Sequence, residues 1–97
     1  MLKLDECKVK LFDFKQNFGH KFGIKAIGIF GSVARQENGI DSDLDIVVDI
    51  ENPTLSSMYT LKEALMDIFH CNIDLVRLRS SLSPFLKQNI EKDAIYV

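Results

Sequence analysis

Cysteine is scarce in this chain of 97 residues, which contains only Cys7 and Cys71. Two cysteines are too few for a disulfide framework. Apolar runs long enough to cross a bilayer are also missing, and the first residues lack the apolar segment of a signal peptide. We therefore expect a cytoplasmic protein with reduced thiols and no association with a membrane.

A general excess of basic residues is absent as well. Residues 1–25 carry six Lys and three acidic residues, residues 26–51 carry one Arg and six acidic residues, and the rest balance at five of each. A general nucleic-acid binder would show a basic face, so we expect no direct contact with nucleic acid. The acidic middle of the chain is either a solvated loop or a site for divalent cations, and the spacing of its acids decides between them.

Repeats and low-complexity segments are missing too, and the 46% hydrophobic content is typical of one globular domain, here spanning residues 1–97. Periodicity and turn residues predict strands at 26–30, 44–50, 73–78 and 94–97. They also predict an amphipathic helix from Leu4 to about Gly19, a short helix at 33–35, a helix opened by Asn52 and Pro53, and a last helix from Ser83. Residues 36–42 are expected to form a loop. Leu55 and Phe85 are expected to point inward from the last two helices. This order predicts an α/β (or α+β) fold in which a small mixed β-sheet packs with helices.

Gly31 and Ser32 stand directly after the expected strand 26–30 and before the short helix. A glycine allows close approach of another group, and the backbone amides and hydroxyl at a helix start can bind phosphate. Taken alone, the pair is more typical of a tight turn.

Acidic residues begin one strand and interrupt another. Asp43 and Asp45 share one face at the head of the strand 44–50, with Leu44 in the core behind them, because side chains alternate along a strand. Two neighbouring carboxylates repel each other unless a cation lies between them, and Mg²⁺ takes such ligands together with substrate phosphates. Asp74 lies within the apolar strand 73–78, where β-propensity disfavours Asp. Each of these acids, taken alone, is also explained by a position on a solvated edge or face.

The combination is more specific than its parts. Gly31 and Ser32, ten further residues, Asp43 and Asp45, and then a strand Asp after a helix match the nucleotidyltransferase signature of the DNA polymerase β superfamily. The first four positions at this spacing would occur by chance in roughly one in a thousand chains of this length, given average residue usage. More closely, residues 31–37 and 42–48 resemble the minimal nucleotidyltransferases, which are the MNT-type antitoxins encoded beside HEPN-domain toxins.

This resemblance runs from about Ala26 to the C-terminus and includes the strand around Asp74. Residues 1–20 match only as a generic amphipathic helix. One departure is Gln36, which stands where such proteins usually have Gly. We expect that position to shape the loop rather than the metal site.

The resemblance implies a polymerase β-like nucleotidyltransferase fold and assigns roles to six residues. Asp43, Asp45 and Asp74 match the catalytic carboxylates that bind two Mg²⁺ ions, and Gly31 and Ser32 match the positions that hold the β and γ phosphates of the nucleotide. Arg35 matches an Arg of the family motif and either pairs with phosphate oxygens or is a solvated Arg near a helix end.

The resemblance further implies an antitoxin enzyme that transfers AMP from ATP to a hydroxyl, expected to be a Tyr, of a HEPN ribonuclease toxin. One alternative is an antitoxin that neutralises its toxin by binding alone. Another is a nucleotidyltransferase for a small molecule, but a chain of 97 residues leaves little material for an acceptor pocket. The residues themselves argue only for metal-dependent chemistry at phosphorus, and none identifies the nucleotide base.

Overall fold

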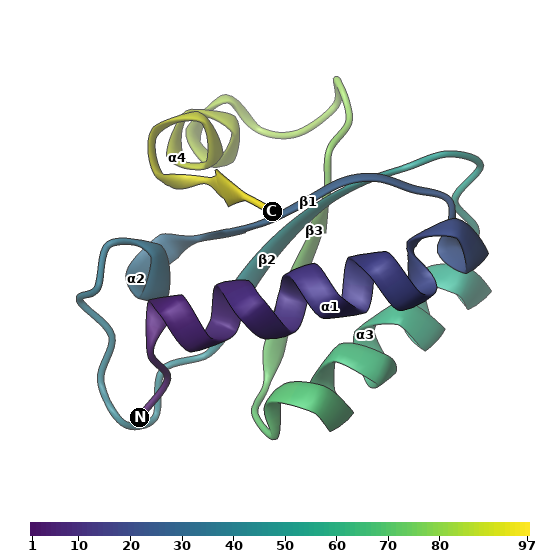
Figure 1. Cartoon of the computed structure of the whole chain (residues 1–97). Coiled ribbons are helices and arrows are strands. Elements are labelled where there is room, and N and C mark those ends of the chain that lie inside the picture. The colour runs from purple at the N-terminus through teal and green to yellow at the C-terminus, as the bar shows by residue number, and fades with distance from the viewer.

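The computed structural model describes residues 1–97 and contains four helices and one four-stranded sheet (Figure 1). The elements are α1 (Leu4–Phe22), β1 (Ile24–Phe30), α2 (Gly31–Ala34), β2 (Leu44–Ile50), α3 (Leu55–Phe69), β3 (Ile73–Arg77), α4 (Pro84–Asp93) and β4 (Ile95–Tyr96). The predicted small mixed sheet packed with helices is confirmed, and β2 has the predicted bounds. None of the helices combines the length and apolar character needed to span a bilayer.

The strands follow the order β3-β2-β1-β4 across the sheet. β1 is antiparallel to both β2 and β4, whereas β2 and β3 are parallel. Parallel neighbours need a crossover connection, which α3 provides. As a result, the end of β1 and the starts of β2 and β3 meet at one end of the sheet. There Asp45 pairs with Phe30 on one side and with Asp74 on the other.

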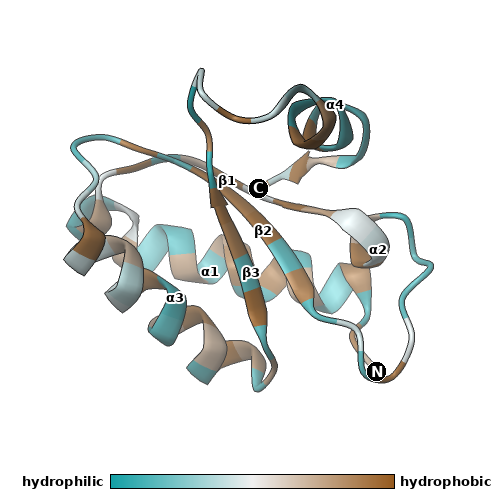
Figure 2. Ribbon diagram, turned by 180° about the vertical axis from the view of Figure 1, so that it is seen from behind, coloured by the Kyte–Doolittle hydropathy of each residue, from teal (hydrophilic) through white to brown (hydrophobic).

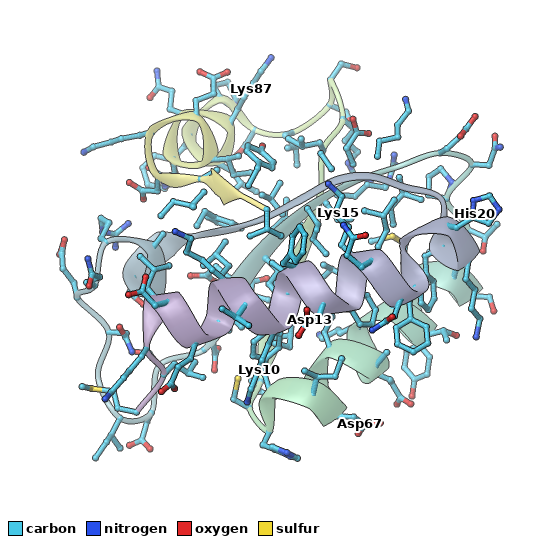
Figure 3. The ribbon with its side chains drawn as sticks, in the orientation of Figure 1. Lys10, Asp13, Lys15, His20, Asp67 and Lys87 are labelled. Atoms are coloured by element: carbon cyan, nitrogen blue, oxygen red, sulfur yellow. The ribbon has the colours of Figure 1, made fainter.

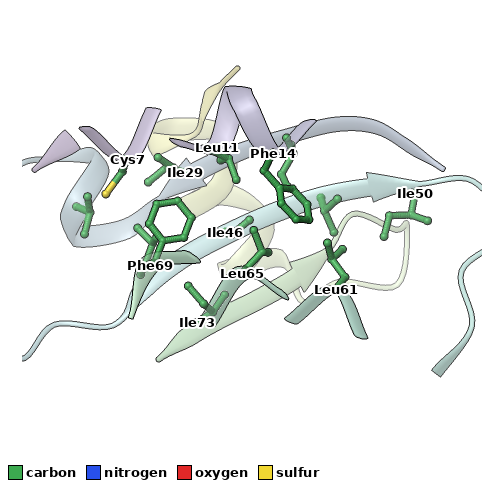
Figure 4. Packing of buried hydrophobic residues seen from close by; sticks show 14 residues of the cluster. Cys7, Leu11, Phe14, Ile29, Ile46, Ile50, Leu61, Leu65, Phe69 and Ile73 are labelled. Carbon is green, nitrogen blue, oxygen red and sulfur yellow. The ribbon is translucent and has the colours of Figure 1, made fainter. Parts of the chain in front are cut away.

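Helices cover both faces of the sheet, with α1 and α3 on one face and α4 on the other (Figures 1 and 2). The larger core lies between the sheet and the first two of these helices and includes Leu11, Ile46 and Leu65 (Figure 4). A smaller core of Phe30, Val47 and Ile90 lies beneath α4. Because side chains alternate along β2, Asp45 points to the same face as Val47. The site is therefore on the face that α4 covers only in part.

Helix α1 continues past Gly19, where the sequence predicted its end. It ends at Gly23, whose backbone is left-handed (φ 69°) and whose N–H donates to the carbonyls of Gly19 and His20. The apolar stripe also extends one turn further than predicted, because the ring of Phe22 stacks on Phe14 with centroids 6.0 Å apart. Packing of this last turn outweighs the low helix propensity of a single internal glycine.

The first turns of α3 and α4 differ from prediction in a shared way. Thr54 and Ser57 form a capping box, so Pro53 precedes α3 instead of lying within it. Leu55 is 94% exposed and Phe85 is 75% exposed, although both were expected to be buried. Both stand in the first turn of their helix, where Met58 of α3 and Leu86 of α4 are the residues that pack against the cores.

Hydrogen bonds join the segment after α4 to β1 and α1. The Val97 N–H donates to the Ile27 carbonyl at 3.0 Å. The Nζ of Lys15, which Figure 3 labels on α1, donates to the main-chain oxygen of Val97 at 2.9 Å. Helix α4 also packs against α2. The C-terminal end of α4 is thereby fixed near the short helix that carries Gly31 and Ser32, and Asp93 at this end bonds to Arg35 just after that helix.

Candidate active site

Gly31 joins β1 to α2 and lies directly against Asp45. Its φ of 73° is in the left-handed region, which a side chain disfavours. A Cβ at this position would also overlap the Asp45 carboxylate. Glycine is therefore required here for two independent reasons, and it is followed directly in α2 by the half-buried Ser32.

Asp45 and Asp74 form the centre of the site. The two residues are direct neighbours in the parallel pairing of β2 with β3. Asp45 is half-buried, whereas Asp74 is exposed. Burial, the charge of Asp74, a hydrogen bond to Asp74 and the charge of Asp43 together raise the pKa of Asp45 from 3.8 to about 6, against a smaller lowering by Arg35. Two carboxyl groups this close favour either one retained proton or a bound cation.

Asp43 lies just before β2 and is exposed. Its charge reaches Asp45, but no three His, Cys, Asp or Glu side chains of the chain are arranged to hold a metal ion. The structure thus brings together two of the three predicted ligands. Carboxylate oxygens suit Mg²⁺, and the elevated pKa of Asp45 marks a place that a cation would stabilise. The chemistry of these donors fits the ion, and the three-ligand site stays a prediction.

Arg35 follows α2 and contacts two acidic residues. Its Nη1 donates to Asp93 Oδ2 at 2.5 Å, and its Nε lies 3.3 Å from Glu37 Oε1. These contacts, chiefly the hydrogen bond to Asp93, raise the pKa of the guanidinium. No local sequence pattern predicted a partner for Arg35, since Asp93 is distant along the chain. The available signal was an acidic residue in the last turn of a helix, where the helix dipole disfavours it.

The carboxylates face an open surface. None of the hollows on the molecule is lined by Asp43, Asp45 or Asp74. The nearest sequence neighbour in such a hollow is Ser42, at a depression of about 330 Å³ beside the start of α1. The Asp43 and Asp74 side chains are thus exposed at the surface and not enclosed in a hollow.

Comparison with known proteins places this arrangement in context. A family model described as polymerase beta nucleotidyltransferase matches residues 13–97. Protein adenylyltransferase MntA of Thermococcus cleftensis is 37% identical over 98 residues, covering 100% of this chain and 98% of the relative. A solved structure provisionally described as a minimal nucleotidyltransferase has a TM-score of 0.80 at 30% identity, covering 97% of this chain and 95% of the other.

A more distant likeness concerns a complex. The structure of a tri-AMPylated Shewanella oneidensis HEPN toxin with its MNT antitoxin gives a TM-score of 0.58 at 23% identity, covering 87% of this chain and 69% of that one. At this level of identity the likeness shows the fold alone.

Proposed function

This chain belongs to the polymerase β nucleotidyltransferase family, and we propose that it transfers AMP from ATP to a hydroxyl of a HEPN-domain toxin, thereby neutralising the toxin. The observation that carries this proposal is the pairing of Asp45 with Asp74, in which Asp45 lies against the glycine that begins α2. The name of the Thermococcus cleftensis relative supports a protein acceptor, and the AMPylated Shewanella oneidensis complex supports a HEPN toxin.

The proposed reaction exchanges one bond at phosphorus for another. The acceptor oxygen, expected to be that of a Tyr, bonds to the α-phosphorus of ATP, the bond from this phosphorus to the β-phosphate oxygen breaks, and pyrophosphate leaves. Asp74 is the more exposed carboxylate of the central pair, so we place it nearest the acceptor and let the hydroxyl proton pass through it to water. Gly31 and Ser32 bind the β and γ phosphates, and Arg35 pairs with their oxygens.

Asp43, Asp45 and Asp74 would hold two Mg²⁺ ions. When bound, such ions favour deprotonation of an attacking hydroxyl and stabilise the charge on a leaving pyrophosphate. The contribution of the chain is to gather the carboxylates where neither strand alone could place them, and to leave the acceptor side open to a partner.

The test is the intact mass of the partner. The purified chain, its HEPN partner, ATP and Mg²⁺ are mixed, and we expect the partner to gain increments of about 329 Da, the mass that one AMP residue adds. The chain itself should gain none. Asp43→Asn should abolish the transfer but still bind the partner, because binding energy at an interface is concentrated in a few anchors rather than in one carboxylate.

The two antitoxin mechanisms predict different protection of cells. If Asp43→Asn binds the toxin without modifying it and protection is lost, the chemistry is the function. Full protection by this variant would show neutralisation by binding alone and would contradict the proposal.

A further inference from the structure

The two carboxylates that contact Arg35 have very different surroundings. The side chain of Asp93 is 6% exposed, whereas that of Glu37 is 65% exposed. The Asp93 contact is also the shorter, at 2.5 Å against 3.3 Å. A charge-assisted hydrogen bond to a shielded carboxylate fixes a guanidinium firmly, whereas solvent screening and side-chain entropy weaken an exposed pair. Asp93 is therefore the residue that determines where Arg35 lies.

Asp93 occupies an unfavourable place for an acid. It ends α4, where the helix dipole is negative, and its carboxylate is shielded from water. A buried charge needs a partner of opposite sign, and Arg35 supplies it from a position 58 residues away. The segment after α4 forms hydrogen bonds with β1 and α1, which hold the C-terminal end of α4 in place. Arg35 therefore bonds to a residue whose own position is fixed.

The hydrogen bond to Asp93 keeps Arg35 on the side of α2 that faces Asp45 and Asp74. The Arg35 N–H donates to the Gly31 carbonyl at 3.1 Å, and residues four apart lie on the same side of a helical turn. Gly31 faces Asp45, and the charge of Arg35 reaches Asp45 as well. A guanidinium has five N–H donors. One is used by Asp93 and one lies toward Glu37, so three remain for a ligand.

We propose that Asp93 is a positioning residue for ATP: its carboxylate holds the Arg35 guanidinium beside α2, and the free N–H groups of Arg35 bind the β and γ phosphates. This inference rests on the proposed function, which places the triphosphate at Gly31 and Ser32. Asp93 itself does not touch the nucleotide. Without it, Arg35 turns into solvent and the triphosphate loses its cationic contact, whereas AMP lacks the two phosphates concerned.

The test compares ATP with AMP by titration calorimetry in the presence of Mg²⁺. We expect Asp93→Asn to weaken ATP binding by about tenfold, which is the low end for the loss of a hydrogen bond to a charged group, and to change AMP binding less than about twofold. Glu37→Gln is the matched control, and it should change neither affinity more than about twofold because an exposed pair contributes little. In an Arg35→Gln background, Asp93→Asn should have no further effect on ATP affinity.

If Asp93→Asn does not fold, Asp93→Glu is titrated with ATP and AMP in its place. It keeps the charge but moves the carboxylate by one methylene, and we expect it to weaken ATP binding at unchanged AMP affinity. Equal losses for ATP and AMP, or a lower melting temperature with unchanged ATP affinity, would make the ion pair purely structural and overturn the inference. Wild-type protein that binds no ATP would contradict the proposed function, and the inference with it.

Discussion

Asp45 is the residue whose protonation couples the site to the stability of the fold. Its pKa is about 6 in the folded protein and 3.8 without the surrounding structure. Between these two pH values the folded state binds a proton that the unfolded state has lost. The free energy of unfolding therefore falls as pH rises through this window. The destabilisation is absent below it and fully present above about pH 6.

Replacing Asp45 by Asn should remove this destabilisation. After discounting for solvent screening we take its cost as about 1 kcal/mol, so the metal-free variant should melt roughly 4–8 °C above wild type at neutral pH. The difference should vanish near pH 4, as followed by circular dichroism during heating. Asp41→Asn, an exposed loop position, should follow wild type. If the melting temperatures of Asp45→Asn and wild type differed by the same amount at every pH in this range, the prediction would be contradicted.

Most residues of the site were predictable from local sequence patterns, but the bond between Arg35 and Asp93 was not. Period-two alternation and the motif spacing led to Gly31, Asp45 and Asp74, which the structure places together. Their roles in catalysis stay predictions. The bond from Arg35 to Asp93 had no local pattern, because it depends on how α4 lies across the sheet. Local sequence patterns carry no information about such long-range pairing.

At the scale of the elements, the end of α2 shows which backbone conformation is needed at position 36, where this chain has Gln36 and similar proteins usually have Gly. The Gln36 N–H donates to the Val33 carbonyl at 3.0 Å, and the Glu37 N–H donates to the Ser32 carbonyl at 2.9 Å. This is the Schellman arrangement, which needs a left-handed residue after the helix. Gln36 supplies it with φ of 60°. The loop thus follows the path that glycine would favour, at the expense of backbone strain.

Gln36→Gly should therefore stabilise the protein. Relief of about 1–2 kcal/mol of left-handed strain exceeds the roughly 0.5–1 kcal/mol of extra chain entropy that glycine loses on folding. We expect a gain of about 0.5–1 kcal/mol, measured by urea unfolding. Gln36→Ala removes the side chain but keeps the strain, so it should give no gain. A lower stability for Gln36→Gly would show that the Gln36 side chain contributes more than its backbone costs.

The elements were predicted best where alternation or capping was strong. β2 was predicted with its bounds, and Ser83 caps α4 as the sequence indicated. The end of α1 was wrong because Phe22 packs one turn beyond Gly19. The inward positions of Leu55 and Phe85 were wrong because Met58 in α3 and Leu86 in α4 are the first-turn residues that reach the cores, and periodicity alone does not settle which residue of a first turn does so.

For the molecule as a whole, ligand binding should be visible as stability. Carboxylates that repel each other in the free protein gain when cations bind, and a ligand at about 100 times its dissociation constant stabilises the folded state by about 2.7 kcal/mol. We expect Mg²⁺ and ATP together to raise the melting temperature, and Asp74→Asn to abolish most of that increase. A melting temperature indifferent to both ligands would favour an antitoxin that only binds its partner.

The parallel pairing of β2 with β3 also has a consequence for the order of folding events. Asp45 and Asp74 lie on either side of the whole of α3 in the sequence, and they become neighbours only when β3 docks beside β2. Such non-local pairing is slow compared with helix formation, because the loop entropy must be overcome first. During refolding, nucleotide binding should then return with this docking step and lag behind the recovery of helical signal. A nascent or partly unfolded chain, however helical, would have no site.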